Sequence, residues 1–470
     1  MTIRKRRILY SFFIALFLIV APPLILYTAG FRYDFEYKRI VETGSLVVKS
    51  NPEGANIYIN NQLHTEPTPT IINTILPDKI NLLIQKDAYH SWEKTIEIKP
   101  RVTSFEENVT LYAESEPVPI IQTTITEYWF NEKQDKIAYI TKDNQLRLFN
   151  ALNQKDTLIA NVDSKPLQSV IWSTNSDQFV FGRGAKEKIE YFIVDANALD
   201  RITALSNITT LPLERVEWDP RARNSLYAIS RGNLYRIPFL LKTARLIFSG
   251  SIEQYLVQEK RITLIQKSEK GEYSLSWITP KDVNTVHLVP FENLNNNSVI
   301  IETHSNRIAI LDSKTNELSI VDISIQDPLS EEAITEIQDV DKLIFTKDGS
   351  HLIYTDKFGI YMQNFNAPIT IIPEKNNHQI IVKYSYPLRE IALSEDENHV
   401  FFITDKSLRV VELNTSYAPR VTELIQDARN LKELKLNYNQ KFASFIDKDN
   451  MLNGLMLDLE GQGSFFSGNE

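Results

Sequence analysis

The chain has 470 residues, a formal net charge of −9 and no cysteine. This length suits two or three domains rather than one. The absence of cysteine excludes a disulfide framework, a thiolate nucleophile and a cysteine-ligated metal site. The acidic balance argues against nucleic acid as a partner, because nucleic acid binding requires clustered positive charge.

The first thirty residues predict a membrane anchor. A basic tail, Arg4-Lys5-Arg6-Arg7, precedes an uncharged apolar run from Ile8 to Gly30. About 20 apolar residues cross a bilayer as a helix, and basic residues before such a run favour a cytoplasmic N-terminus. The sequence predicts a cytoplasmic tail at residues 1–7, a single transmembrane signal-anchor helix at residues 8–30, and a juxtamembrane linker at residues 31–43. A cleaved signal peptide is the alternative, because small residues end the run.

The remainder of the chain is then predicted to lie outside the cytoplasm. Residues 31–470 keep 47 basic against 60 acidic side chains. An exported acidic chain without disulfides suits a bacterial cell envelope better than a eukaryotic secretory route, where disulfides are frequent. The predicted localisation is therefore the cell membrane, with a single pass and the bulk of the chain extracytoplasmic.

Two short alternating segments flank the tetrapeptide Asn51-Pro52-Glu53-Gly54. Residues 44–50 and 56–59 alternate apolar and polar side chains, which is typical of half-buried strands. Asn, Pro and Gly occupy the first, second and fourth positions of a type I turn. The pattern predicts a β-hairpin, a module that favours binding over catalysis.

With Ala55, this segment reads Pro-Glu-Gly-Ala and resembles the PEGA domain, a small all-β module of bacterial and archaeal surface proteins. The resemblance continues through four dipeptides that stand at the family's Asp-Gly turn, Thr-Pro pair, Pro-Gly turn and Gly-Tyr pair: Asn60-Asn61, Thr68-Pro69, Pro77-Asp78 and Ala88-Tyr89. It covers residues 44–113, the predicted PEGA-like domain. The resemblance implies anchoring and contact with envelope polymers or a surface layer rather than chemistry.

From residue 117 the chain repeats a pattern of short strands and polar turns. Each unit begins with a bulky apolar anchor, and the anchors recur every 38 to 48 residues at Trp129, Trp172, Trp218, Leu256, Ile301, Phe345, Leu393 and Leu436. This period with four strands per unit is typical of a β-propeller. The units resemble the repeats of Tol-Pal-type and WD-repeat-like proteins. The fold is thus predicted to be mainly β, with a C-terminal propeller at residues 117–470 of eight blades, or seven because the Leu256 unit is short.

The last repeat lacks a clear fourth strand. Pro119-Ile120-Ile121-Gln122, one strand before the first repeat, is apolar and extended in character. We expect this segment to fill the outer position of the last blade. Closure of this kind removes exposed strand edges.

No linear motif predicts catalysis. The histidines do not pair at His-Glu-x-x-His spacing, and no Gly-x-Ser-x-Gly elbow is present. Asp447-Lys448-Asp449-Asn450 is interpreted as a turn rather than a calcium loop. Trp129, Trp172 and Trp218 are interpreted as wedges between blades rather than a rim that binds glycan or peptide. The sequence predicts no catalytic, cofactor-binding or metal-binding residue, and it leaves the binding residues unknown.

These features predict a non-catalytic, membrane-anchored envelope protein that presents a PEGA-like module and a propeller as an interaction platform. Its expected partners are the membrane, through the helix, and an envelope protein or glycan, with no nucleic acid. The alternative function is a propeller-type hydrolase or lyase acting on envelope polysaccharide, because propeller enzymes gather catalytic residues from several blades.

Overall fold

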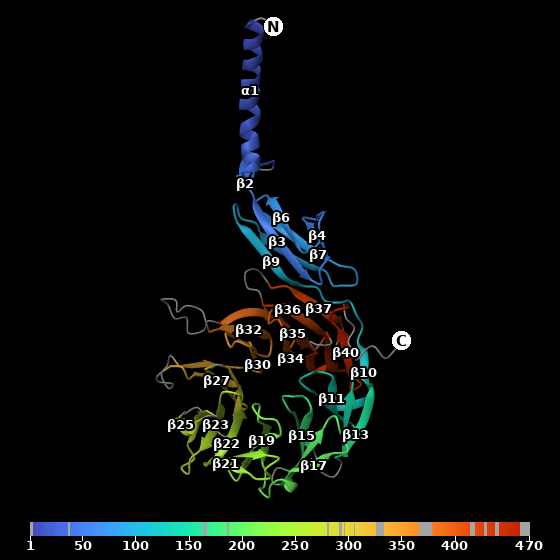
Figure 1. Ribbon diagram of the computed structural model, residues 1–470, viewed down its shortest axis with the longest axis vertical. Coiled ribbons are helices and arrows are strands. Elements are labelled where there is room, and N and C mark those ends of the chain that lie inside the picture. Colours follow the sequence, from blue (N-terminus) through green and yellow to red (C-terminus); the bar gives the residue numbers. More distant parts are fainter. Residues whose placement is uncertain are drawn as a thin grey trace. The chain divides into compact units, whose positions relative to one another are not determined.

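The computed structural model describes most of the chain, namely residues 3–35, 38–162, 167–185, 188–279, 282–290, 294–295, 297–304, 306–325, 333–365, 378–413, 419–426, 430–437 and 441–460. Two compact units emerge (Figure 1). The first comprises Met1–Ser115 with Asn414–Leu424 and Leu457–Glu460. The second comprises Glu116–Leu413, Ile425–Met456 and Gly461–Glu470. The tail after Gly461 lies outside the described residues.

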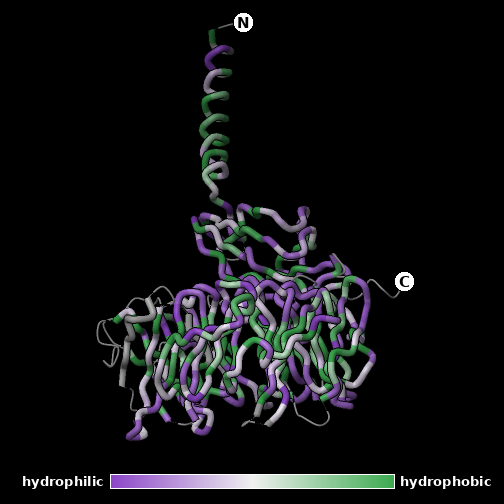
Figure 2. Tube along the Cα trace, turned by 60° about the horizontal axis from the view of Figure 1, so that its bottom comes forward, coloured by the Kyte–Doolittle hydropathy of each residue, from purple (hydrophilic) through white to green (hydrophobic). Residues whose placement is uncertain are grey.

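The first unit begins with the helix α1 (Ile3–Thr28), which runs through Pro22 and Pro23. Within it, Leu9–Thr28 has a mean hydropathy of 2.4, and none of this segment is buried by the described protein. Figure 2 shows mostly hydrophobic colouring along this helix, with a hydrophilic stretch near its N-terminal end. The predicted apolar N-terminal helix is therefore present, and it is long and apolar enough to cross a membrane.

A two-stranded sheet, β1 (Phe31–Asp34) and β2 (Arg39–Glu42), follows the helix directly. The sequence predicts only a linker here. The paired strands arise because Phe31, Tyr33 and Ile40 supply β-favouring side chains on both strands.

Residues 44–113 fold into two sheets that share one core. One sheet has the order β6-β3-β9, from β3 (Gly44–Asn51), β6 (Thr70–Ile75) and β9 (Thr103–Thr110). The other has the order β5-β4-β7-β8, from β4 (Asn56–Ile59), β5 (Gln62–Leu63), β7 (Lys79–Gln85) and β8 (Trp92–Glu97). Their inward faces meet in a cluster that includes Leu46, Val48, Ile57, Leu82, Ile84 and Trp92.

The predicted hairpin around Asn51-Pro52-Glu53-Gly54 is wrong. Strand β3 pairs with β6 and β9, whereas β4 pairs with β5 and β7, so the segment crosses from one sheet to the other. The crossing is held by Thr68: its carbonyl oxygen accepts a hydrogen bond from the Gly54 N–H at 2.8 Å, and its Oγ1 accepts one from the Ala55 N–H at 3.0 Å. Alternation along two segments shows that both are strands, but it does not show that they pair with each other.

Two of the dipeptides matched to the family adopt the backbone that the missing glycines would favour. Asn60 and Asn61 have φ values of 48° and 66°, and they form the two-residue turn between β4 and β5. Ala88 has a φ of 65°, in the left-handed region where glycine is usual.

The neighbouring Tyr89 holds the segment Leu457–Glu460 inside the same unit. Its hydroxyl donates to the Asp458 carboxylate at 2.9 Å and accepts from the Leu459 N–H at 3.1 Å. Lys86 lies 2.9 Å from the Glu460 carboxylate, and the Ala113 N–H donates to the Leu457 carbonyl at 3.0 Å. The Ala88-Tyr89 turn therefore serves as a clasp for a segment that lies more than 350 residues later in the chain.

The second unit is built from antiparallel sheets, although residues 421–424 of one of their strands, β37, belong to the first unit. Six of them have four strands in chain order: β14 (Leu167–Trp172), β15 (Gln178–Ala185), β16 (Lys188–Asp195), β17 (Ile202–Ala204); β18 (Arg215–Trp218), β19 (Ser225–Ser230), β20 (Asn233–Pro238), β21 (Arg245–Phe248); β22 (Ile252–Val257), β23 (Ile262–Lys267), β24 (Tyr273–Thr279), β25 (Asp282–Pro290); β26 (Ser298–His304), β27 (Arg307–Asp312), β28 (Glu317–Asp322), β29 (Ile334–Ile337); β30 (Lys342–Phe345), β31 (His351–Thr355), β32 (Gly359–Asn364), β33 (His378–Lys383); and β34 (Leu388–Leu393), β35 (His399–Thr404), β36 (Ser407–Glu412), β37 (Val421–Gln426). A short 3₁₀ helix, η1 (Leu205–Asn207), follows β17.

The seventh sheet joins the two ends of the unit. Its order is β13-β12-β11-β10-β40-β39-β38, from β10 (Val118–Phe130), β11 (Lys136–Thr141), β12 (Gln145–Asn150), β13 (Lys155–Asn161), β38 (Lys432–Asn437), β39 (Phe442–Ile446) and β40 (Met451–Met456). The long strand β10 serves two groups of four strands. Its first part pairs with β40, including Ile121 opposite Leu452, and its last part pairs with β11.

The closure predicted from Pro119–Gln122 is therefore confirmed. The first part of β10 supplies the outer strand of the last group, as the missing fourth strand required. The described strands fall into eight groups of four when β10 is counted in both. The number of blades, eight or seven, stays a prediction.

Buried side chains join consecutive sheets from the closing sheet to β30–β33. Among the described residues, one cluster combines β10, β11, β39 and β40. A second combines β11 and β12 with β14, β15 and β16. Similar clusters join the later sheets along the chain, and the last of them contains Phe345 and Tyr354. Such apolar contacts between consecutive sheets are what hold a propeller together.

The register of the predicted anchors is partly wrong. Trp172, Trp218, Phe345 and Leu393 each end the first strand of their sheet, as expected. In the first repeat that position belongs to Phe130 rather than Trp129, because Phe130 pairs with Ile137 just as Trp172 pairs with Phe179. Leu256 lies one residue early in β22, and Ile301 falls at a register shift in β26.

Candidate binding surface

Of the tryptophans at the repeat anchors, Trp218 is buried, whereas Trp129 and Trp172 are half-buried and pack against the cluster between the first two sheets. The Trp172 Nε1–H donates to the Trp129 carbonyl at 3.2 Å, and the Trp218 Nε1–H donates to the Ile171 carbonyl at 2.8 Å. Each bond joins a sheet to the one before it. The interpretation as a wedge is thus confirmed for Trp218, and the half-buried Trp172 makes the same kind of link.

Buried tyrosines form the same kind of link. The Tyr255 hydroxyl, on β22, lies 3.2 Å from both the Arg215 and Tyr227 carbonyl oxygens of the preceding sheet. The Tyr128 hydroxyl, on β10, donates to the carbonyl oxygens of Glu433 on β38 and Ser444 on β39. It therefore links the first strand of the unit to its last strands. Burial raises the pKa of both tyrosine hydroxyls, because the charged form would lose its hydration.

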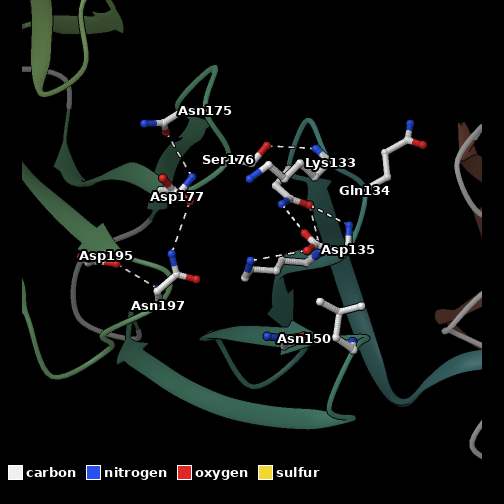
Figure 3. A network of polar contacts seen from close by, with 12 residues as sticks. Lys133, Gln134, Asp135, Asn150, Asn175, Ser176, Asp177, Asp195 and Asn197 are labelled. Atoms are coloured by element: carbon white, nitrogen blue, oxygen red, sulfur yellow. Dashed lines mark hydrogen bonds and ion pairs between the residues drawn. The ribbon is translucent and has the colours of Figure 1, made fainter.

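Polar turns after the first strands form a hydrogen-bonded network (Figure 3). The Lys133 N–H donates to the Ser176 Oγ at 2.9 Å, which joins the turn after β10 to the turn after β14. Asp177 accepts from the Asn197 side chain at 3.3 Å and lies 2.9 Å from the Arg223 guanidinium of the next sheet. This network fixes the turns to one another, and it accounts for their Asp, Asn and Ser content without a ligand.

The carboxylate of Asp348 shows how strongly one such turn is held. It accepts hydrogen bonds from the Ser350 N–H at 2.9 Å, the Ser350 hydroxyl at 2.7 Å and the Thr346 hydroxyl at 2.8 Å. These bonds, the Ser350 N–H first, lower the pKa of Asp348 to about 2. The low pKa therefore reflects turn architecture rather than a catalytic acid.

The first strands of the sheets form the inner wall of the ring. They contact one another in succession: β10 with β14, β14 with β18, β18 with β22, β22 with β26, β30 with β34, and β34 with β38. In a ring of radially arranged sheets, only the innermost strands approach each other in this way. From these strands we select eight charged and polar side chains, which we call the inner wall: Glu127, Arg215, Glu217, Gln254, Lys342, Glu390, Glu433 and Lys435.

One part of the inner wall joins β18 to β22. Arg215 donates to the Gln254 side chain at 2.7 Å and to Glu217 at 2.9 Å. Glu217 also accepts from the Val257 N–H at 3.0 Å. Burial raises the pKa of Glu217, and the neighbouring Arg215 opposes that shift. Both carboxylate oxygens are thus engaged in the wall, which is typical of a structural rather than a proton-transferring group.

The opposite part joins β30, β34, β38 and β10. Lys342 lies 3.6 Å from the Glu390 carboxylate, and Lys435 lies 3.9 Å from that of Glu433. The Lys435 ammonium also donates to the Tyr128 carbonyl. Burial lowers the pKa of Lys435, while Glu433, Glu127 and Glu390 oppose the shift. Three carboxylates around one partly buried ammonium make this the most charged stretch of the wall.

The inner wall presents both signs of charge on rigid strands. Lys342 and Glu433 keep 47% and 42% of their side-chain surface exposed, so they remain available to a bound molecule. Such a surface fits a partner that carries charged or hydrogen-bonding groups. Within the described parts of the chain, no group of three or more His, Asp or Glu side chains is arranged to hold a metal ion.

No sequence motif points to the inner wall, because its residues come from strands that lie about one repeat apart. Only the anchors that neighbour them, such as Trp218 beside Glu217 and Leu436 beside Lys435, are visible as a pattern. The polar residues of the first strands could have been aligned once the anchors were in register.

A family comparison finds that residues 43–114 match the PEGA domain. The match extends the residues 44–113 recognised from sequence by one at each end, so the resemblance is confirmed. No curated protein matches the chain.

Solved β-propellers resemble this chain. The Dos1 propeller aligns with 8% sequence identity and a TM-score of 0.51, covering 74% of this chain and 97% of that one. The C-terminal WD40 domain of Sif2 aligns with 12% identity and a TM-score of 0.47, covering 73% and 98%. The β-propeller domain of Myceliophteria thermophila Cps50 (Swd1) aligns with 12% identity and a TM-score of 0.41, covering 73% and 100%. At these identities the likeness concerns the fold alone, and the predicted fold class, mainly β with a C-terminal propeller, is confirmed.

Proposed function

We propose that this chain, with its PEGA domain and its propeller behind one apolar helix, is a membrane-anchored and non-catalytic interaction platform of the bacterial cell envelope. Its helix spans the cell membrane once with the N-terminus in the cytoplasm, and the two β-rich parts lie outside. Its partners are envelope proteins or polymers. The observation that carries the binding role is the inner wall, which gathers exposed charges of both signs on rigid strands.

The proposed membrane anchor is supported by the exposure of α1. None of the Leu9–Thr28 segment is buried by the described protein. A segment of 20 residues with a mean hydropathy of 2.4 would forgo a large hydrophobic free energy in water, whereas a bilayer of about 30 Å accommodates it. The basic residues Arg4–Arg7 before the segment favour the proposed orientation.

The proposed non-catalytic role is supported by the hydrogen bonds that already hold the carboxylates of the scaffold. Glu217 is held by Arg215 and by a backbone N–H, and Asp348 is held by its own turn. Groups fixed in this way hold the scaffold together. A binding surface needs no more than the exposed charges that remain on the inner wall.

A photocrosslinking experiment in living cells tests the binding role with the full chain. A photoreactive amino acid replaces Lys342 on the inner wall or, as the matched control, Leu158 on β13, the outermost strand of its sheet. The two side chains are similarly exposed, at 47% and 45%. We expect a discrete crosslinked product from position 342 and none from position 158.

A second variant tests whether charge selects the partner. Glu390→Lys places a like charge beside Lys342 and reverses one charge of the wall. With the photoreactive group at Glu433, this change should reduce the crosslinked product, and raised salt should do the same because exposed charges are screened. Two results would show that the inner wall is not the binding surface. One is an equal amount of crosslinked product from position 158, and the other is an amount that changes neither with the charge reversal nor with raised salt.

A further inference from the structure

The hairpin β1–β2 exposes aromatic and apolar side chains directly after the membrane helix. Phe35 at its turn is 83% exposed, and Tyr33 and Ile40 on its two arms are also exposed. Tyr33 and Phe35 pack edge to face with ring centroids 5.1 Å apart. A single exposed apolar side chain is ordinary, but three on one short hairpin form a patch.

The position of this patch relative to a bilayer follows from the helix. Leu9–Thr28 has 20 residues, which rise about 30 Å as an α-helix and match the hydrocarbon thickness of a bilayer. The hydrocarbon boundary therefore lies near Thr28. The hairpin begins at Phe31, only three residues farther on, at the depth of the polar headgroups.

Both ends of the helix carry the aromatic and basic pairs that are typical of membrane interfaces. At the first end, Arg6 Nε donates to the Tyr10 hydroxyl at 3.1 Å. At the second end, the Arg32 guanidinium lies 3.7 Å from the centre of the Tyr27 ring and donates to the Tyr27 carbonyl at 2.8 Å. Tyrosines prefer the level of the headgroups, so these pairs place the two interfaces on either side of the apolar segment.

Hydrogen bonds hold the hairpin against the end of the helix. The Gly30 carbonyl accepts from the Thr43 N–H at 3.0 Å and from the Thr43 hydroxyl at 2.8 Å, so the residue after β2 returns to the residue before β1. Figure 1 shows the hairpin beside this end of α1. The exposed side chains therefore cannot move far from the hydrocarbon boundary.

Among the described strands, none outside the hairpin pairs with it. In the described structure β1 and β2 form a sheet of two strands alone. An isolated two-stranded hairpin is at best marginally stable in water. Contact with lipid would bury the apolar side chains that the two-stranded sheet leaves exposed. The isolated pairing of β1 with β2 is thus a second observation that points to the bilayer as the partner of the hairpin.

We propose that the β1–β2 hairpin lies in the headgroup region of the bilayer, with Tyr33, Phe35 and Ile40 in contact with lipid. This inference rests on the proposed transmembrane anchor. Its consequence is positional, because Thr43 continues into the PEGA domain: the Thr43 carbonyl accepts from the Arg101 N–H at 3.1 Å, and Glu42 pairs with Arg101. A hairpin seated in the interface would fix the base of the PEGA domain at the membrane surface.

The cysteine-free chain allows a direct depth measurement with spin labels. Single cysteines are introduced as Phe35→Cys, Ile40→Cys, Leu63→Cys and Ile19→Cys, labelled with a nitroxide, and the full chain is reconstituted in vesicles of phosphatidylcholine and phosphatidylglycerol. Leu63 is the matched control, because it is an exposed apolar residue at 61% in the PEGA domain. Ile19 reports the membrane span. Relaxation by oxygen and by a water-soluble nickel chelate gives the depth of each label.

We expect the labels at positions 35 and 40 to show several-fold higher oxygen-to-nickel accessibility than the label at position 63, and lower than that at position 19. Suppose that the labels at positions 35 and 40 are as accessible to nickel as the label at position 63, while the label at position 19 remains inside the bilayer. That result would overturn the hairpin inference and leave the proposed anchor intact. Nickel access at position 19 as well would overturn both. Labels at 35 and 40 shielded from both reagents, or coupled to a second copy, would show protein rather than lipid on the patch.

Discussion

Truncation of Ile121 to alanine is expected to destabilise the second unit as a whole, by about 2–5 kcal/mol. Ile121 is buried on the first part of β10, where it pairs with the fully buried Leu452 of β40. The loss of its side chain leaves a cavity where the two ends of the unit meet. Because the ring closes through this pairing, the loss affects contacts between sheets as well as one strand.

Deletion of residues 117–123 removes the pairing entirely, and it should abolish the cooperative unfolding transition of the second unit rather than fray one end. Denaturant unfolding of the full chain, followed by tryptophan fluorescence, measures both effects, since Trp172 and Trp218 lie in this unit. Leu158→Ala is the matched control, because Leu158 is exposed on β13, an edge strand of the same sheet. Its change should stay within about 0.5 kcal/mol. Equal shifts for Ile121→Ala and Leu158→Ala would refute closure as a source of stability.

Replacement of Trp218 by alanine should cost about 3–5 kcal/mol of unfolding free energy. Its ring is buried in the cluster between β14–β16 and β18–β20, edge to face with Phe239 at 5.9 Å. Its indole N–H also satisfies the Ile171 carbonyl. Trp218→Phe should cost less, because it keeps most of the apolar surface and loses the hydrogen bond.

Thermal or denaturant unfolding of the full chain compares these two variants with Leu246→Ala. Leu246 is exposed on β21, the last strand of the same sheet, so its truncation serves as the control. The order of destabilisation should be Trp218→Ala, then Trp218→Phe, then Leu246→Ala. If Trp218→Ala left stability unchanged but removed the crosslinked product of the inner wall, the aromatic binding rim would be the better account.

Closure of the ring was predictable from sequence because two signals agreed. One repeat lacked its fourth strand, and an apolar extended segment at Pro119–Gln122 had no place in another repeat. The exact anchor position in the first repeat was harder to predict, because Trp129 is bulkier than its neighbour Phe130 and so fits the sequence pattern better. Only the pairing of Phe130 with Ile137 reveals the equivalent position.

The fold of the PEGA domain shows what a local pattern cannot determine. The strands on either side of Asn51–Gly54 were predictable, but their partners depend on Thr68, which lies 13 residues beyond Ala55 in the chain. The clasp of Tyr89 on Asp458 spans a far longer separation. The inner wall is similar, because it combines single residues from separate repeats, such as Arg215 with Gln254.

The central claim, an envelope platform held outside the membrane by an uncleaved helix, is tested most directly by labelling single cysteines in spheroplasts. The membrane of these cells is intact and its outer face is accessible. Leu240→Cys lies on a highly exposed loop of the second unit, and Ile3→Cys lies at the start of α1. A membrane-impermeant maleimide should label position 240 in intact spheroplasts and position 3 only after lysis, and the labelled chain should stay in the membrane pellet after an alkaline wash. A soluble labelled chain that begins near Phe31, or labelling of position 240 only after lysis, would contradict the account.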